Sequence, residues 1–171
     1  IHIEASGERI QVDSEYPKVN GNGFSIKYEI TIPKTAILDR IETVNGKIEI
    51  TGMTSEVHFA TVNGGGKVYG CSGRVQGETV NGGLQVEALP GQPLKEVELK
   101  AVNGGIKLIT PDLNDVQVKA ETVNGGITTD FPLEVRKGLG GKSLAGTLGN
   151  GSGRIHIETV NGGISISRNA S

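Results

Sequence analysis

Four glutamates occupy the same position of a repeated sequence and are the first candidates for chemistry. Each lies three residues before an asparagine of the repeat, and together they are Glu42, Glu78, Glu121 and Glu158. Glycoside hydrolysis needs two carboxylates roughly 5 to 10 Å apart in a cleft. Ala60 and Lys100 hold this position in the intervening copies, so neighbouring copies are expected to alternate in charge rather than to pair acids. We interpret the column as a solvated strand face with cross-strand ion pairs, and we predict no catalytic residue.

Residues that could bind a metal or act as a nucleophile are scattered. His58 and His156 share one column of the repeat but are expected to lie several coils apart, too far to share an ion. Residues 112–115 offer carboxylate and amide oxygens but lack the glycine and the distal glutamate of a calcium-binding loop. Cys71 is the only cysteine, so no intrachain disulfide can form, and no histidine lies near it in the sequence. We therefore predict no metal and no cofactor.

The elements that must position these residues are written as a repeat. A Val-Asn-Gly sequence preceded by Thr or Ala occurs six times, and its asparagines are Asn45, Asn63, Asn81, Asn103, Asn124 and Asn161. Successive asparagines are 18, 18, 22, 21 and 37 residues apart. A period near 20 residues is typical of repeat architectures. The last step is close to twice the period, as if one copy had lost its signature turn.

Apolar and polar residues alternate on both sides of each asparagine, as expected of strands with one buried face. Each copy therefore reads as a strand, an Asn-Gly turn, a second strand and a variable connection. Asn-Gly suits turns with positive φ, and between alternating runs it is a strong signal for an antiparallel hairpin. The other arrangement is the corner of a β-solenoid, in which each copy forms one coil. The alternation itself fits both arrangements.

The identity of the six turns favours the solenoid. A meander of hairpins gives no reason for every turn to be the same, whereas stacked corners place the asparagines in an amide ladder at the strand spacing of ~4.8 Å. A dozen strands in one open sheet would also exceed the usual limit of roughly 10 and leave an apolar face uncovered. We predict an all-β fold, a single-stranded parallel β-helix with 18 to 22 residues in each regular coil.

The column four residues before each asparagine is expected to point into the core. It holds Phe59, Gly77 and Leu99 in three successive copies. Because Gly77 has no side chain, we expect it to make room for both large neighbours. Phe59 and Leu99 are therefore predicted to be buried.

The length of the chain suits one domain, and we assign residues 1–171 to a single β-solenoid. Regular coils are predicted over residues 39–130. Residues 131–153 are an irregular insertion, for which a protruding hairpin and an irregular coil both fit the sequence. Residues 154–171 are assigned to the last coil and a short tail.

The N-terminal part lacks a clean repeat. Residues 1–38 contain strand-like runs, including 24–32, and a degenerate copy of the repeat at 19–21. Solenoids need atypical terminal repeats that close the core and protect the exposed strand edge. We therefore assign residues 1–38 to an irregular N-terminal cap with one or two irregular coils.

Four motifs occur together along the chain. An Ile-Pro follows an early long strand, Glu-Thr-Val-Asn-Gly-Gly recurs, Thr-Asp-Phe-Pro spans 129–132, and Gly-Thr-Leu-Gly at 146–149 precedes the last Thr-Val-Asn-Gly. Over residues 20–168 this combination resembles a bacterial family of β-strand repeats that carries the label adhesin and has no known function. The resemblance implies a single-stranded β-helix, commonly outside the cytoplasm, and implies no catalytic residues.

Charge and composition exclude two classes of partner. The net charge is −2, from 17 basic and 19 acidic residues, and no basic stripe or set of stacking aromatics points to nucleic acid. No stretch approaches the ~20 apolar residues of a membrane span. The chain begins at Ile1 rather than Met, which suits the removal of a leader. With the resemblance, this predicts an extracytoplasmic location, whether periplasmic, cell-surface or secreted.

We predict a non-enzymatic binding or scaffold module whose partner is a protein or a glycan. The alternative is a polysaccharide lyase or hydrolase on a β-helix, and the lack of an acid–base set and of tryptophan for sugar stacking argues against it. The C-terminal coil is expected to end in unpaired strand groups and so to allow self-association by β-augmentation. Loops on a rigid repeat scaffold often carry binding residues. The candidates there are Pro90, Gln92, Asp112, Asn114, Asp115, Arg136, Lys137 and Lys142.

Overall fold

The computed structural model describes the chain except for residues 1, 7–8, 14–25, 95, 139 and 170–171, and its described part contains strands and no helix. The all-β class predicted from the alternation is confirmed. The chain divides into two compact units, Ile1–Thr31 and Ile32–Ser171, and each is described by itself.

The two strands that the structure describes in the first unit form a hairpin and not a coil of a solenoid. Its strands β1 (His2–Ser6) and β2 (Arg9–Asp13) pair antiparallel, whereas successive coils pair in parallel. The irregular coils predicted within residues 1–38 are therefore wrong for the described part of this unit. The degenerate copy at 19–21 lies outside the described residues.

The strand predicted over residues 24–32 is also wrong where the structure describes it. Residues 26–32 belong to no strand. The alternating apolar side chains of Ile26, Tyr28 and Ile30 are 37, 40 and 61% exposed, so the alternation does not mark a buried face here.

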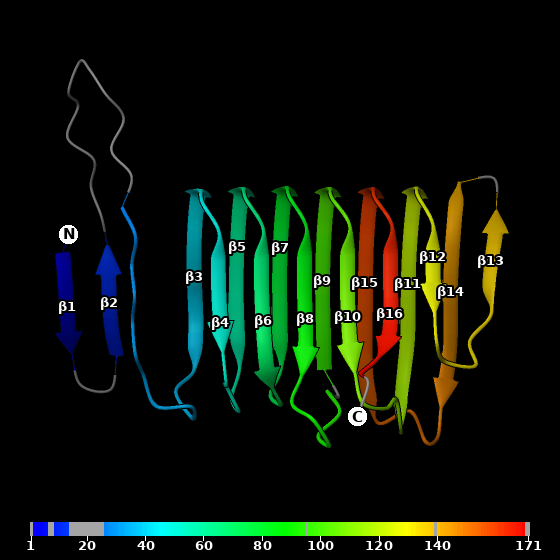
Figure 1. Cartoon of the computed structure of the whole chain (residues 1–171), viewed down its shortest axis with the longest axis horizontal. Coiled ribbons are helices and arrows are strands. Elements are labelled where there is room, and N and C mark those ends of the chain that lie inside the picture. The colour runs from blue at the N-terminus through cyan, green and yellow to red at the C-terminus, as the bar shows by residue number, and fades with distance from the viewer. Residues whose placement is uncertain (1, 7–8, 14–25, 95, 139, 170–171) are drawn as a thin grey trace, which may run out of the picture. The chain divides into compact units, whose positions relative to one another are not determined.

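The second unit is a two-sheet solenoid (Figure 1). The strand before each Asn-Gly corner joins an eight-stranded sheet, which in spatial order contains β3 (Leu38–Asn45), β5 (Val57–Asn63), β7 (Val75–Asn81), β9 (Glu96–Asn103), β15 (Gly153–Asn161), β11 (Val116–Asn124), β14 (Gly141–Leu148) and β13 (Val135–Gly138). The strand after each corner joins a six-stranded sheet, which contains β4 (Ile48–Thr51), β6 (Gly66–Cys71), β8 (Leu84–Ala88), β10 (Ile106–Thr110), β16 (Ile164–Arg168) and β12 (Ile127–Thr129). The strands from β3 to β12, together with β15 and β16, pair in parallel, which confirms the β-helix.

The corner asparagines form the predicted ladder. Each Nδ2 donates to the Oδ1 of a neighbouring coil, as Asn63 to Asn45 at 3.0 Å, Asn81 to Asn63 at 2.9 Å, Asn103 to Asn81 at 2.9 Å, Asn161 to Asn103 at 2.8 Å and Asn124 to Asn161 at 2.9 Å. These side chains are exposed. Each hydrogen bond between two asparagine side chains therefore contributes about 0.5–1.5 kcal/mol to the stability of the fold, the net value of an ordinary hydrogen bond. Its loss does not leave a buried amide group unpaired.

A second ladder runs beside the first and is buried. In four coils the threonine two residues before the asparagine donates its hydroxyl to a corner glycine carbonyl of a neighbouring coil: Thr61 to Gly46 at 3.3 Å, Thr79 to Gly64 at 3.0 Å, Thr159 to Gly104 at 2.9 Å and Thr122 to Gly162 at 2.8 Å. Ala101 takes this position before Asn103. These four threonines are 3–4% exposed. The sequence shows the threonine column but does not show what it bonds to.

The corner glycines are required by the neighbouring coil. Among the six glycines that follow the asparagines, Gly82 alone has a positive φ, at 154°, and no corner asparagine has one. A Cβ on Gly64 would overlap the carbonyl oxygen of Gly46, and one on Gly104 would overlap that of Gly82. The expectation that positive φ selects Asn-Gly is therefore wrong for the other corners. At all of these except Gly46, the close approach of two backbones selects glycine.

The coils do not stack in the order of the chain. β15 lies between β9 and β11, and β16 lies between β10 and β12. After β10 the chain leaves one coil position empty, builds the next coil and an end hairpin, and then returns to fill the position (Figure 1). This return explains the 37-residue step. Because the last coil is paired on both sides, the prediction that it presents unpaired strand groups is wrong.

A four-residue turn carries the chain back across β11. Gly149 and Gly151 in this turn have φ of 60° and 68°, in the left-handed region that favours glycine. Asp115 holds the turn, because its Oδ1 accepts from the backbone N–H of Asn150 at 2.9 Å and its carbonyl accepts from that of Gly153 at 2.7 Å. Asp115 itself has a φ of 55°, the only positive value of a non-glycine residue in the described part.

Of the two alternatives for residues 131–153, the structure shows the hairpin. β13 and β14 pair antiparallel, and β14 also pairs antiparallel with β11. The hairpin therefore closes one end of the eight-stranded sheet and does not protrude from it. Its outer strand carries the exposed Arg136 and Lys137, charges that discourage pairing with a further strand.

The prediction for the core column is confirmed. Phe59 and Leu99 are fully buried, and they flank Gly77 in register. A Cβ on Gly77 would lie 2.5 Å from Phe59 Cζ and 3.1 Å from Leu99 Cδ2. Gly66 in the facing sheet also makes room, since a Cβ there would overlap the same phenyl ring. One large side chain thus fills space that two glycines leave.

We expect Gly64→Ala to destabilise the solenoid by about 1–3 kcal/mol, because the new methyl must displace the backbone of the preceding coil. Gly46→Ala is the matched control. Gly46 holds the same place in the motif, but the nearest atom to its Cβ is Thr43 Oγ1 at 3.4 Å. Its substitution should change stability by about 0.5 kcal/mol or less. Urea unfolding measures both variants, and equal losses would contradict the role of the backbone approach.

Phe59→Ala should cost roughly 3–5 kcal/mol, because it leaves a cavity in a well-packed core. Gly66→Ala alone should destabilise the protein, since its methyl overlaps the ring. In the Phe59→Ala background the same methyl enters the cavity, so the double variant should be more stable than Phe59→Ala alone. A double-mutant cycle by chemical denaturation tests this sign change, and additive losses would show that the two residues do not share one space.

Candidate functional site

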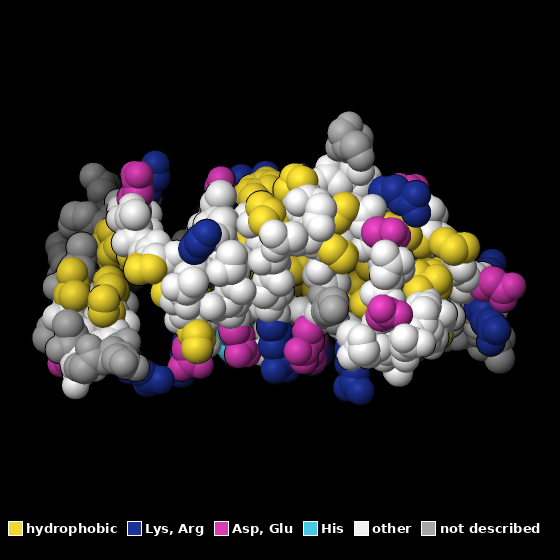
Figure 2. All heavy atoms as spheres, turned by 90° about the horizontal axis from the view of Figure 1, so that it is seen from below, with side chains coloured by type: hydrophobic (Ala, Val, Ile, Leu, Met, Phe, Trp, Pro, Cys, Tyr) yellow, Lys and Arg dark blue, Asp and Glu magenta, His cyan; other side chains and the backbone are white. Residues whose placement is uncertain are grey.

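The outer face of the eight-stranded sheet presents a regular grid of polar side chains. Residues that alternate with the core point outward from β7, β9, β15, β11 and β14 and line up in register across the strands. Seen from the edge that carries the variable connections, acidic and basic side chains alternate along one long side of the repeat unit (Figure 2).

The inserted coil changes which charges meet on this face. Glu158 pairs in register with Glu121 on one side and with Lys100 on the other. The expectation that neighbouring coils alternate in charge is therefore wrong at Glu121 and Glu158, because no coil separates these two glutamates. His156 likewise lies between Lys119 and Glu98, far from His58, as expected.

The inserted coil and β11 build a compact charged cluster. Lys119 Nζ lies 2.8 Å from Glu121 Oε2, and His156 Nε2 lies 2.8 Å from Glu158 Oε1. The second distance suits an ion pair when the imidazole is protonated. The direction is poor for an N–H···O bond, however, and the buried Nε2 atom has no hydrogen bond among the described residues. We therefore treat this contact as electrostatic.

Glu121, His156 and Glu158 also have the donor types of a divalent metal site. One donor atom from each lies within 4.8 Å of the others. Imidazole and carboxylate donors suit zinc. The ammonium of Lys119 already holds Glu121, and Lys100 is drawn electrostatically to Glu158. Two lysines beside the trio oppose a divalent cation, so we interpret the trio as an ion-pair cluster, and the prediction of no metal stays a prediction.

The cluster continues onto β9 and β7. Lys100 Nζ lies 2.6 Å from Glu98 Oε1, and Gln76 Nε2 donates to Glu98 Oε2 at 2.9 Å. The hydrogen bond from Lys100, followed by that from Gln76, holds the pKa of Glu98 below its ordinary value. The hydrogen bond to Glu98 raises the pKa of Lys100, and that to Glu121 raises the pKa of Lys119.

A hollow of about 590 Å³ lies directly beside this cluster, over β14, β11 and β15. Its outward side chains form two rows in register: Ala145, Lys119 and His156, and then Thr147, Gln117 and Arg154. The small side chain of Ala145 and the backbone at Gly146 leave the space open. The hollow exists only because β14 and β15 flank the same strand, so no local sequence signal points to it.

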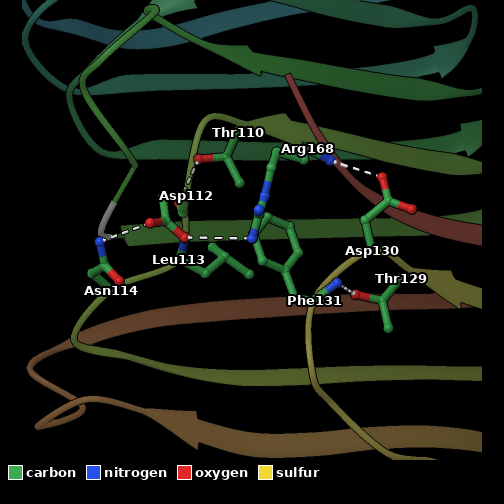
Figure 3. Close-up of polar contacts among 8 residues, drawn as sticks. All are labelled: Thr110, Asp112, Leu113, Asn114, Thr129, Asp130, Phe131 and Arg168. Atoms are coloured by element: carbon green, nitrogen blue, oxygen red, sulfur yellow. Dashed lines mark hydrogen bonds and ion pairs between the residues drawn. The ribbon is translucent and has the colours of Figure 1, made fainter. Parts of the chain in front are cut away.

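Several of the predicted binding-loop residues hold structure together instead. Asp112 caps its own turn, with Oδ1 accepting from Leu113 N at 2.8 Å and Oδ2 accepting from Asn114 Nδ2 at 3.1 Å (Figure 3). Arg168 lies 3.9 Å from Asp112, stacks 5.2 Å from the ring centroid of Phe131, and donates its backbone N–H to Asp130 Oδ2 at 3.0 Å (Figure 3). These contacts tie the ends of β10 and β16 to the residues that follow β12.

The remaining loop candidates are spread over the unit and do not form one site. Pro90 and Gln92 are exposed in the turn between β8 and β9. Asp115 is used by the turn that crosses β11. Arg136 and Lys137 are on β13, and Lys142 is on β14. A binding role for these residues stays a prediction.

The comparison with protein families agrees with this geometry. The family model described as Toastrack DUF4097 matches residues 40–167. The chain belongs to the Toastrack DUF4097 family. Toastrack is a β-solenoid-like domain of unknown function, so membership supports the fold, whereas the adhesin role implied by the resemblance belongs with the proposals below. Neither curated proteins nor solved structures give a significant match to this Toastrack chain. In the part of the chain that the structure describes, no helix has the length and apolar character to span a membrane.

Replacing Lys100 by methionine should raise the pKa of Glu98 toward its ordinary value, because it removes the strongest of the hydrogen bonds that lower it. A lowered pKa means that the carboxylate stabilises the fold above its unfolded pKa and loses this effect as the pH falls through the folded pKa. The wild type should therefore lose slightly more stability on acidification than Lys100→Met, by well under ~1 kcal/mol, since both side chains are at least one-third exposed.

An NMR titration of the Glu98 carboxyl carbon measures this shift directly. Lys119→Met is the control, because Lys119 bonds to Glu121 and does not contact Glu98. A Glu98 that titrates at the same pH in wild type and Lys100→Met would contradict the assigned cause.

Proposed function

We propose that this Toastrack chain is a non-catalytic binding module that holds an anionic glycan on the outer face of its eight-stranded sheet. The observation that carries the proposal is the hollow beside the inserted coil, whose charged lining is Lys119, Arg154 and His156. Repeat scaffolds commonly bind through one extended face. We also propose an extracytoplasmic location and an adhesin-like or scaffolding role, in line with the family resemblance of the sequence.

The charge of the hollow favours an anion. Among the side chains that line it, three carry or can carry positive charge and none is acidic. Lys119 is partly neutralised by Glu121, but Arg154 has no ion pair with any described residue. Its register neighbour Glu96 lies instead 3.4 Å from Arg74. Arg154 therefore has an unshared guanidinium, the group best suited to grip a carboxylate or sulfate in bidentate fashion.

The polarity of the hollow favours a sugar over an apolar peptide. Gln117 and Thr147 add an amide and a hydroxyl to the rim, and Ala145 is the only outward apolar side chain in the lining. Polar donors and acceptors around a shallow, open floor suit a hydroxyl-rich ligand. An apolar side chain of a peptide would find no apolar pocket there.

Calorimetric titration with oligogalacturonate, an acidic glycan, tests the proposal, and a neutral oligomaltoside is the comparison ligand. We expect binding of the acidic ligand only, with an affinity that falls as salt is added. Arg154→Gln should weaken binding about tenfold or more, because it removes a charge-assisted hydrogen bond. Arg40→Gln is the matched control, because Arg40 lies on β3, at the other end of the same sheet, and contacts Glu42.

Three results would count against this proposal. Equal affinity for the acidic and the neutral glycan would show that charge does not determine binding. Unchanged binding in Arg154→Gln would show that the glycan binds elsewhere on the protein. Binding of a poly-glutamate peptide without binding of oligogalacturonate would show an acidic protein partner instead of a glycan.

A second candidate is a carbohydrate-active enzyme, and the register of Glu121 with Glu158 is the observation that favours it. Donor atoms of the two carboxylates lie within 4.8 Å of each other, close to the roughly 5–5.5 Å that separates the carboxyl groups of retaining glycosidases. The contacts with Lys119 and His156 and the open sheet face favour binding over turnover. Release of reducing ends from an acidic polysaccharide, abolished in both Glu121→Gln and Glu158→Gln, would establish this candidate and overturn the binding module.

A further inference from the structure

The inserted coil fills a slot that is bounded by strands on both sides. β15 pairs with β9 and β11, while β16 pairs with β10 and β12. The four core side chains of the coil are almost fully buried, at 0–1% exposure, and they are Ile155, Ile157, Ile164 and Ile166. The rest of the solenoid therefore provides a receptor that matches two strands in length, register and side-chain volume.

The corner ladders also pass through this coil without interruption. Asn161 donates to Asn103 at 2.8 Å and accepts from Asn124 at 2.9 Å. Thr159 donates to Gly104 at 2.9 Å, and Gly162 accepts from Thr122 at 2.8 Å. The ladder hydrogen bonds of the corners on either side of the slot can therefore form only when a coil with the Thr-Val-Asn-Gly sequence occupies the slot.

The connection that delivers the coil is short. Leu148 at the end of β14 and Gly153 at the start of β15 both pair with Val116 of β11, so four residues must span two strand spacings, about 10 Å. In this turn Gly149 and Gly151 have positive φ, and Asn150 between them donates its backbone N–H to Asp115. The ladder bonds of the coil do not depend on this turn, because they join the coil to β9, β10, β11 and β12.

We propose that the slot between β9–β10 and β11–β12 accepts the coil of a second copy of this chain as well as its own. Residues 153–169 of each copy would then complete the solenoid of the other, as in domain swapping. The exchanged and unexchanged forms have the same contacts inside the slot and differ only in the path of the turn. The partner is therefore a second copy of this chain, and the interface is the interior of the solenoid rather than its end.

Shortening the turn of the full-length chain tests the proposal. Deletion of residues 149–151 leaves two peptide steps between Leu148 and Gly153, about 7.6 Å at full extension, which is less than the width to be crossed. Within one copy the coil can then no longer reach its slot in register. We expect a dimer of twice the monomer mass by light scattering, with the circular dichroism of the wild type. A folded monomer would overturn the proposal.

A second test keeps the natural turn and is informative even where the deletion variant does not fold. Lys100→Cys and Glu158→Cys are introduced into separate full-length chains, which are mixed in denaturant and refolded together at high concentration. These positions are register neighbours on β9 and β15, and the native Cys71 is buried. An exchanged coil places the two new thiols side by side, so mild oxidation should give a disulfide-linked dimer.

The controls separate exchange from random contact. Both substitutions in one chain should give an intramolecular disulfide, which confirms that the geometry permits the bond. Glu78→Cys mixed with Glu158→Cys should give no linked dimer, because β9 separates the two strands. If the Lys100→Cys and Glu158→Cys mixture forms no more linked dimer than this control, the coil does not exchange.

Discussion

The close approach of neighbouring backbones at the Asn-Gly corner is the constraint on which the solenoid depends. At every corner except the first, at Gly46, the carbonyl oxygen of one coil occupies the space where the next coil would carry a side chain, and only glycine permits this. The approach brings the asparagine amides and the threonine hydroxyls within hydrogen-bonding distance of the adjoining coil. The corner therefore sets both the distance between coils and their register, and the core columns follow from that register.

Much of this could be predicted because the information is periodic. The asparagine column predicts the ladder, and the core column predicts the buried positions of Phe59 and Leu99 around Gly77. The reason for the glycines was predicted incorrectly, because positive φ is a local property whereas the overlap with a neighbouring carbonyl appears only when coils are stacked. The same limit applies to the buried threonine bonds.

The order in which the coils stack could not be predicted from the sequence. Each Thr-Val-Asn-Gly corner fits against any other, so Asn161 satisfies the ladder equally well after Asn124 or between Asn103 and Asn124. This single ambiguity decides the candidate site. It places Glu158 beside Lys100 as well as Glu121, and it puts β14 and β15 on either side of β11, where the hollow forms. The residues of the site were visible in the sequence, but their neighbours were not.

The position of the last coil also affects how the protein is made. A solenoid with coils in chain order can grow on the ribosome one coil at a time, each new coil adding to a finished edge. Here residues 153–169 emerge after both of the coils that flank them. The nascent chain must therefore keep β9–β10 and β11–β12 apart, or part them again, until synthesis has passed these residues. Cooperative closure of the core is thus delayed until residues 153–169 have been synthesised, and two complementary strand edges stay exposed until then.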